Sequence, residues 1–246
     1  MKLCAVQLAS HKGDLAGNLH RHLQAMEQAA AHDAELVVFP ELSLSGYEPT
    51  LAQRVVTAAD DVLLRPLQAQ CDRLDVTAAI GLPMPAAAGV HIGMLILRPR
   101  QAPLLYAKQR LHADELPFFV AGAQPLVFAA GALQIAPAIC YESMFIEHAH
   151  SVRALGAELY LVSVAKTAKG VAEGFAHYPK AARQSGMAVL MANCVGAADN
   201  FIGAGQSAAW DAQGNLLGQL DEHSEGLLLL DTTRNSAQAF ALEFAP

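Results

Sequence analysis

Three reactive side chains occupy similar places in the sequence, because each follows a short apolar run directly or after a single proline. They are a carboxylate, an ammonium and a thiol: Glu41, Lys108 and Cys140. Such short apolar runs are typical of buried strands. Ligands of open α/β sheets bind beyond the carboxyl ends of the strands, so we expect the three groups to meet in one crevice.

A thiol, a carboxylate and an ammonium together suit acyl transfer from an amide. A cysteine thiol with a pKa of about 8.5 is mostly protonated at neutral pH, so it needs a base. Glu41 would take this proton and return it to the departing amine. Lys108 would stabilise the oxyanion, together with the backbone N–H of Tyr141 at a strand-to-helix junction. The sequence therefore predicts a thioester on Cys140 that water hydrolyses.

The other three cysteines are predicted to be structural. Cys4 and Cys194 lie inside apolar runs and Cys71 lies inside a helical pattern, where a thiol acts as a small apolar side chain. The cysteines show no CxxC spacing, and a chain of this length needs no disulfide framework. Reduced thiols in a cytoplasmic protein are therefore expected.

Alternating strands and helices must position these residues, and this alternation predicts an α/β domain. The predicted helices are Leu15–Ala30, Leu63–Leu74, Glu142–Leu155 and Glu173–Ser185. The number of strands indicates two stacked sheets, and the last dozen residues are predicted to form a tail. The predicted strands are Lys2–Leu8, Glu35–Phe39, Val76–Leu82, His91–Leu97, Leu104–Ala107, Leu126–Ala129, Leu133–Ile139, Leu159–Val164, Ala188–Asn193 and Gly226–Asp231, with a hairpin over Trp210–Leu217.

The composition describes a globular protein, and we expect a single domain over residues 1–246. Hydrophobic residues make up 53% of the chain and charged residues 16%, which excludes disorder. The net charge of −7 includes no basic stripe, so no nucleic-acid partner is expected. No signal peptide and no run of about 20 apolar residues is present, so we expect a cytoplasmic protein without a membrane partner.

Three motifs give the chain a resemblance to the nitrilase superfamily of carbon–nitrogen hydrolases. Val37–Tyr47 is similar to the glutamate motif of that family and Ile139–Phe145 to its cysteine motif. Tyr106–His112, followed by Glu115, is similar to its lysine motif. Weaker similarity near both ends extends the resemblance over nearly the whole chain.

The resemblance implies a four-layer α-β-β-α sandwich and a catalytic triad that uses no metal and no cofactor. Carried over to this chain, Glu41 is the general base, Lys108 the oxyanion stabiliser and Cys140 the nucleophile. Glu115 corresponds to the second glutamate of the family, which orients the lysine or the substrate. The resemblance further implies a homodimer, or a higher homo-oligomer, that pairs through the helices after the lysine-side and cysteine-side strands.

The chain departs from the family pattern just after the cysteine. Many members carry an arginine three or four residues on, where this sequence has Ser143 and Met144. Arginine is the preferred partner of a carboxylate, so the departure favours small linear amides with a neutral acyl part. A cation from another segment would reverse that preference, and the candidates are Arg110, Lys166 and Arg183.

Amide hydrolysis on a small-molecule substrate is the leading prediction. Nitrile or N-carbamoyl hydrolysis on the same triad, and a non-catalytic binding protein of the same fold, are the alternatives. Gly203–Ala208 fits a loose dinucleotide pattern, but no clear strand is expected before it and a hairpin is expected after it. Histidines two apart on a helix do not share a face, so His20 with His22 and His148 with His150 predict no metal site.

Overall fold

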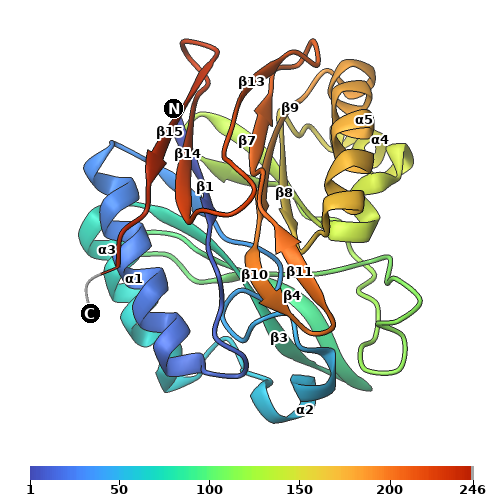
Figure 1. Cartoon of the computed structure of the whole chain (residues 1–246). Coiled ribbons are helices and arrows are strands. Elements are labelled where there is room, and N and C mark those ends of the chain that lie inside the picture. Colours follow the sequence, from blue (N-terminus) through green and yellow to red (C-terminus); the bar gives the residue numbers. More distant parts are fainter. Residues whose placement is uncertain (245–246) are drawn as a thin grey trace.

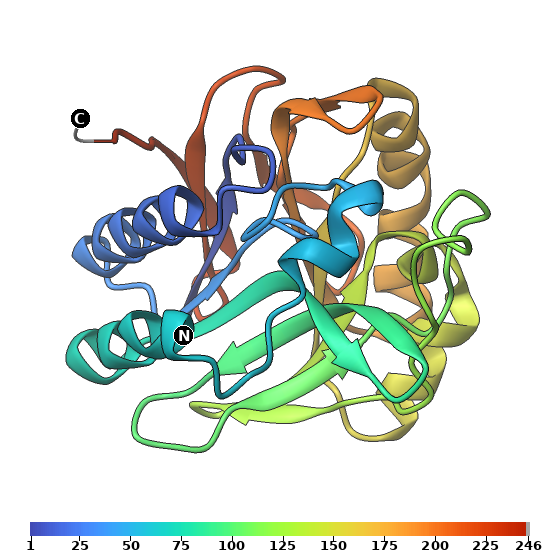
Figure 2. The same cartoon turned by 90° about the horizontal axis from the view of Figure 1, so that it is seen from below.

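The computed structural model describes residues 1–244, and it consists of two stacked β-sheets with helices on both outer faces. Figure 1 shows α1 and α3 on one side of the sheets and α4 and α5 on the other. The view from below in Figure 2 shows the same order of layers. This arrangement confirms the α-β-β-α sandwich that the resemblance implied.

The first sheet has seven strands in the order β15-β14-β1-β2-β3-β4-β5. β2 lies between β1 and β3 and is parallel to both, and all strand pairs further toward the two edges are antiparallel. The strands are β1 (Lys2–Gln7), β2 (Leu36–Val38), β3 (Thr77–Ala86), β4 (Gly89–Leu97), β5 (Leu104–Ala107), β14 (Gly226–Asp231) and β15 (Ser236–Ala241).

The second sheet has six strands in the order β13-β12-β9-β8-β7-β6, and β7, β8 and β9 are parallel. A separate two-stranded hairpin joins β10 to β11. The strands of this half are β6 (Phe128–Ala130), β7 (Leu133–Ile139), β8 (Leu159–Val164), β9 (Ala188–Asn193), β10 (Val195–Ala198), β11 (Phe201–Ala204), β12 (Ala208–Trp210) and β13 (Leu216–Gln219).

Local capping defines the ends of the helices. The Asp14 carboxylate accepts from the Gly17 N–H at the start of α1, and the Thr167 hydroxyl accepts from the Gly170 N–H at the start of α5. The α-helices are α1 (Leu15–Ala31), α2 (Ala52–Val55), α3 (Arg65–Leu74), α4 (Ile146–Ala154) and α5 (Ala168–Ser185), and the 3₁₀ turns are η1 (Pro49–Leu51), η2 (Val62–Leu64) and η3 (Cys140–Met144).

Each pair of adjacent layers encloses an apolar core. Leu36 and Ile96 of the first sheet meet Ile135 and Leu161 of the second in the central core. Each sheet also has one outer core, between its outer face and the helices that cover it. Met26 lies in the outer core of the first sheet, and Tyr160, Tyr178 and Trp210 lie in that of the second. Because strands such as β8 are buried along their whole length, the loops at their ends are held by two cores at once.

Several predicted elements differ from the structure, either in where they begin or in the type of secondary structure. The final segment is not a tail, because β15 pairs with β14 as an edge strand. The Gly203–Ala208 segment does follow and partly overlap a strand, since Gly203 lies within β11. The helix predicted from Glu173 begins at Ala168, because Thr167 caps a turn whose glycine weakens the helical pattern. The helix predicted from Glu142 begins as η3 and becomes α-helical at Ile146.

Candidate active site

The structure brings Glu41, Lys108 and Cys140 together, with Glu41 beneath a cavity that Lys108 and Cys140 line. The Lys108 ammonium lies 2.7 Å from Glu41 Oε1 and 2.6 Å from Glu115 Oε1, and these side chains are almost completely buried. Lys108, Glu115 and Cys140 line a cavity of about 400 Å³. The expected convergence of the three predicted residues is therefore present, and Glu115 joins them as a second carboxylate on the lysine.

Close backbone packing fixes the position of Glu41 just beyond β2. The Glu41 N–H donates to the carbonyl of Val164 in the second sheet at 3.3 Å, and the Ser163 hydroxyl donates to the Phe39 carbonyl at 2.8 Å. A side chain at Gly81 would place its Cβ 2.5 Å from both Pro40 O and Leu42 N. The glutamate segment therefore lies against β3 and is bonded to β8.

Lys108 is fixed by its own backbone at the end of β5. Its N–H donates to the Ile92 carbonyl at 2.9 Å, and its carbonyl accepts from the Gly122 N–H at 2.8 Å. A Cβ at Gly122 would lie 2.4 Å from the Ala107 carbonyl oxygen, so only glycine allows this approach. The ammonium is consequently delivered from a rigid strand end.

Cys140 stands at a sharp turn between β7 and η3. Its φ of +45° lies in the left-handed region, which is uncommon for a residue other than glycine and is often found at functional sites. The Ser143 hydroxyl donates to the Cys140 carbonyl at 2.6 Å and stabilises this turn. Tyr141 comes next, in the first turn of η3, where N–H groups have no partner inside the helix. Cys140 and Tyr141 both line the cavity, so the turn brings the thiol and the first residues of η3 to it together.

Glu142 ties the lysine segment to the cysteine turn. Its carboxylate accepts from the backbone N–H of Gln109 at 2.5 Å and of Ile139 at 2.7 Å, and from the Tyr106 hydroxyl at 2.7 Å. The side chain is completely buried. One carboxylate thus fixes the residues next to Lys108 and Cys140 relative to each other. The sequence contained this signal, since Glu142 belongs to the cysteine motif, but it was not predicted.

Burial and neighbouring charges shift the ionisation of the three groups. Burial raises the pKa of Glu41 to about 7, although Lys108 opposes the shift. Burial would lower the pKa of Lys108, but Glu41, Cys140 and Glu115 raise it above its ordinary value. Burial, followed by the Glu41 charge, raises the pKa of the Cys140 thiol to about 11. At neutral pH the thiol is protonated and the lysine is charged, so the nucleophile must lose its proton during the reaction.

Glu41 has an oxygen available for that proton. Its Oε1 accepts from Lys108, whereas its buried Oε2 has no hydrogen-bond partner in the described part of the chain. Unpaired buried oxygens are rare and often mark a group that acts in catalysis. A carboxyl with a pKa of about 7 exchanges protons readily near neutral pH.

Aromatic and polar side chains close the rest of the cavity. Tyr47 donates to Glu115 Oε1 at 2.9 Å and packs edge-on against Phe201 of β11. Tyr141 is partly exposed, and its ring packs edge-on against His112 and Phe145. Tyr47 and Phe201 were not predicted as site residues, although Tyr47 ends the glutamate motif. The hairpin that carries Phe201 was missed altogether.

No metal centre is found among residues 1–244, where no group of three or more His, Cys, Asp or Glu side chains could hold an ion. The buried His148 instead contacts the hydroxyls of Tyr106 and Tyr160 at 3.0 and 2.7 Å. No helix of the described residues is long and apolar enough to cross a membrane.

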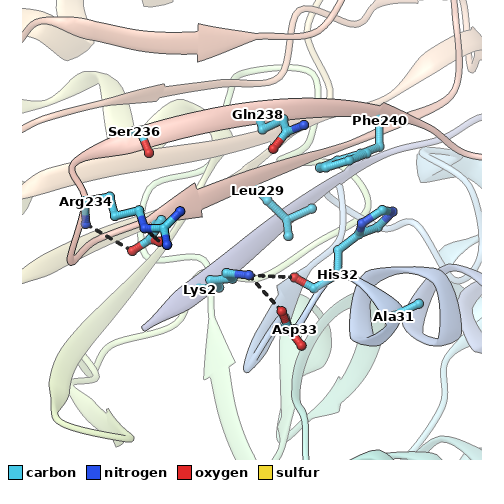
Figure 3. Close-up of a pocket in the computed structure, with 10 residues that line it drawn as sticks. Lys2, Ala31, His32, Asp33, Leu229, Arg234, Ser236, Gln238 and Phe240 are labelled. Atoms are coloured by element: carbon cyan, nitrogen blue, oxygen red, sulfur yellow. Dashed lines mark hydrogen bonds and ion pairs between the residues drawn. The ribbon is translucent and has the colours of Figure 1, made fainter.

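A second hollow, of about 270 Å³, lies between the end of α1 and the β14–β15 hairpin (Figure 3). Its charged groups are already paired, since Lys2 donates to Asp33 and to the His32 carbonyl. His32 stacks on Phe240. This hollow contains no group of reactive side chains comparable to the first cavity.

Comparisons with known proteins agree with this geometry. The family model described as carbon–nitrogen hydrolase matches residues 2–242. An (R)-stereoselective amidase from a Pseudomonas species is 30% identical, over 88% of this chain and 80% of its own length. A glutamine-dependent NAD(+) synthetase from Xylella fastidiosa is 28% identical over 99% of this chain, which spans only 46% of the length of that synthetase.

Solved structures of an amidase from Nesterenkonia sp. AN1 show the same fold. A cysteine-to-alanine mutant of that amidase in complex with butyramide gives a TM-score of 0.88 at 26% identity, over 96% of this chain and 92% of the other. A glutamate-to-glutamine mutant carries the acetamide moiety of fluoroacetamide on its active-site cysteine, with a TM-score of 0.86 at 26% identity, over 93% and 89% of the two chains. The family match, the fold and the order of the motifs agree, and the chain belongs to the carbon–nitrogen hydrolase family of the nitrilase superfamily.

Proposed function

We propose that the protein hydrolyses small linear amides to a carboxylic acid and ammonia through a thioester on Cys140. One observation carries this proposal: a buried lysine is held between two carboxylates in the cavity that contains the thiol. The amidases among the similar proteins support the reaction class. The cavity of about 400 Å³ suits a small molecule.

The first half of the reaction forms the thioester. Glu41 takes the proton of Cys140 as the sulfur attacks the amide carbon, and the carbonyl oxygen becomes an oxyanion. A lysine ammonium has three N–H donors. Glu41 and Glu115 each accept one from Lys108, so the third is free for the oxyanion. The Tyr141 N–H supplies a second donor. Glu41 then protonates the nitrogen, the carbon–nitrogen bond breaks and ammonia leaves.

The second half regenerates the enzyme. Water enters where ammonia left, Glu41 takes one of its protons, and the hydroxide adds to the thioester carbon. When the second tetrahedral intermediate collapses, the carbon–sulfur bond breaks. Glu41 returns the proton to the Cys140 thiolate, and the acid leaves. Glu115 and Tyr47 hold Lys108 in place through both halves.

Ammonia release from a panel of small amides, nitriles and N-carbamoyl compounds tests the proposal. We expect release from the linear amides, and we expect Cys140→Ala to abolish it because the nucleophile is lost. Cys194→Ala is the matched control, since it removes a buried thiol that lies outside the proposed triad. Release from nitriles or N-carbamoyl compounds alone would replace the amide reaction with one of those alternatives. No release from any compound by the folded protein would contradict catalysis.

A further inference from the structure

The active-site cavity contains a second lysine that the proposed reaction does not use. Lys166 lines the cavity together with Cys140 and Lys108, and its side chain is only 7% exposed. No residue in the described part of the chain accepts a hydrogen bond from its ammonium or forms an ion pair with it; its recorded hydrogen bonds are made by its backbone. The residue is mostly buried, but its ammonium is not among the buried side-chain atoms of the described residues that lack a partner, so it can meet a ligand in the cavity.

The backbone holds Lys166 firmly in this place. β8 pairs in parallel with β7, with Ile139 opposite Ser163, so Lys166 and Cys140 follow the same ends of adjacent strands. The Lys166 N–H donates to Asn193 Oδ1 at 2.8 Å, and its carbonyl accepts from the Ala204 N–H at 2.9 Å. The lysine therefore has a defined position beside the nucleophile.

The three carboxylates that line the cavity do not neutralise Lys166, because each is bonded to another residue or is exposed to solvent. Glu115 accepts from Lys108 and Tyr47. Asp114 lies 2.5 Å from His112 Nδ1 and has 65% of its side chain exposed, whereas Glu173 faces Lys169 at 4.0 Å and is 58% exposed. Solvent screens the two rim carboxylates. Lys166 is thus the buried cation whose charge is left for a ligand.

The charge of Lys166 persists at neutral pH. Burial would lower its pKa, but Tyr178 and Cys140, followed by Glu41 and Glu173, raise the pKa above its ordinary value. The Tyr178 hydroxyl forms a hydrogen bond with the Ser143 hydroxyl at 2.8 Å, and it forms no hydrogen bond with Lys166. The ammonium is available as a permanent positive charge within the cavity.

Of the three cations considered from the sequence, Lys166 alone lines the cavity. The Arg110 guanidinium lies over the Phe145 ring, 4.3 Å from its centre. Arg183 lies in the last turn of α5, and one of its terminal nitrogens would be 2.7 Å from a Cβ at Gly214. Neither arginine lines the cavity.

We propose that Lys166 binds a carboxylate at the far end of the acyl chain, so that the preferred substrates are linear ω-amido acids. This inference rests on the proposed amide hydrolysis, and it reverses the preference for a neutral acyl part that the sequence suggested. The buried ammonium pairs with the substrate carboxylate while the amide carbon reaches Cys140. A hydrogen bond to a charged group of this kind is worth about tenfold to hundredfold in affinity.

The test compares each ω-amido acid with an amide in which a methyl group replaces the carboxylate. Succinamic acid is paired with butyramide and glutaramic acid with pentanamide, and kcat/KM is measured from ammonia release. We expect at least one acid to exceed its neutral partner by about tenfold or more. We expect Lys166→Met to remove this advantage, so that kcat/KM falls at least about tenfold more for the acids than for the neutral amides. Lys166→Arg should retain part of the advantage.

Lys169→Met is the matched control, because it removes an exposed lysine three residues further along the chain, in the first turn of α5. It should leave the preference unchanged. Equal losses for acids and neutral amides in Lys166→Met would overturn the inference, since the lysine would then act on the chemistry. Turnover of neutral amides by the wild type without any advantage for the acids would overturn it even if Lys166→Met does not fold. No ammonia from any amide would instead overturn the proposed function itself.

Discussion

At the scale of single residues, the site couples a protonated thiol to a carboxyl that titrates near neutrality. Cys140 does not exist as a stable thiolate, because burial and Glu41 raise its pKa to about 11. Burial likewise raises the pKa of Glu41 to about 7, which suits a group that must accept and return a proton in each half-reaction. Lys108 remains charged throughout, since its neighbours Glu41, Cys140 and Glu115 raise its pKa against the effect of burial.

The shifted pKa of Glu41 predicts the pH dependence of turnover. The base is the carboxylate form, which predominates above about 7 and is lost as the pH falls below it. We therefore expect kcat/KM for a neutral amide to rise with pH through about 7 and then level off. A pH titration with an uncharged substrate avoids changes in the substrate itself. A rise at the ordinary carboxyl value would mean that the pKa of Glu41 is not raised, and a rate independent of pH in this range would mean that Glu41 is not the base.

Glu41→Gln separates proton transfer from the presence of the thiol. Glutamine keeps the size of the side chain but cannot accept a proton, so we expect kcat to fall by at least about 10²-fold. The thiol should still react with fluoroacetamide, as the cysteine of the Nesterenkonia amidase mutant does. Peptide mass analysis after labelling reads this out, with Cys140→Ala as the unlabelled control. If Glu41→Gln retained near-normal turnover, another group would have to carry the proton.

At the scale of elements, the site depends on strand ends that are packed too closely to shift. Gly81 in β3 is the clearest case, since a Cβ there would lie 2.5 Å from the backbone on either side of Glu41. Gly81→Ala should displace the glutamate segment and lower kcat by about tenfold or more, together with a loss of thermal stability. Circular dichroism and ammonia release measure the two effects.

Gly156→Ala is the control for the effect of stability alone. Its φ of +96° makes any side chain strained, but no atom lies within 4 Å of the added Cβ. We expect it to cost about 1 kcal/mol of stability and to leave kcat unchanged. Equal loss of kcat in both variants would show that Gly81 acts through general stability and not through the position of Glu41.

Strands and motifs were predictable from the sequence, but contacts and short elements were not. β5, β7, β8, β9 and β14 have the bounds that the apolar runs predicted. β8, β9 and β14 are buried along nearly their whole length, which leaves a continuous apolar pattern, whereas edge strand β5 is an apolar run that is only partly buried. β10 and β11 are short, and Gly196 and Gly203 interrupt their pattern. Edge strand β15 alternates alanine with Ser236, Gln238 and Phe240 and forms no apolar run, which concealed its pairing with β14.

The same contrast holds for the site. Glu41, Lys108 and Cys140 were predictable because each closes an apolar run inside a motif, and the proximity of Glu115 to Lys108 followed from the resemblance. Glu142 belongs to the cysteine motif, but its role was missed because its partners Tyr106 and Gln109 lie 36 and 33 residues away along the chain. Lys166 was named only as one of three cations, because the sequence could not show which of them is buried beside the thiol.

At the scale of the whole molecule, the four layers leave α4 and α5 on an outer face (Figure 1). The family resemblance places the contact between two copies of the chain on the helices after the lysine-side and cysteine-side strands. α4 follows the cysteine-side strand β7, whereas no helix of the described residues lies between β5 and β6, so we expect a homodimer in solution that pairs through α4. Leu155, just after α4, is 56% exposed and is available for such a contact. Light scattering at micromolar concentration should give twice the mass of the chain, and Leu155→Lys should weaken the dimer.

Val62→Lys is the matched control for the dimer. Val62 is 67% exposed and precedes α3, on the opposite outer layer, so the same substitution there should leave the mass unchanged. A wild-type protein that is monomeric at micromolar concentration would contradict the expected assembly. It would not affect the account of the triad, since every residue of the triad comes from one copy of the chain.

The most direct test of the central claim is detection of the acyl group on Cys140. The protein is mixed with a linear amide that it hydrolyses, and the reaction is quenched in acid within milliseconds. The protein is then digested, and the masses of its peptides are measured by mass spectrometry. We predict that the peptide containing Cys140 gains the mass of the acyl group as a thioester, and that Cys140→Ala shows no such gain. An enzyme that releases ammonia with no acylated Cys140 peptide, or with the acyl group on another residue, would contradict the proposed mechanism.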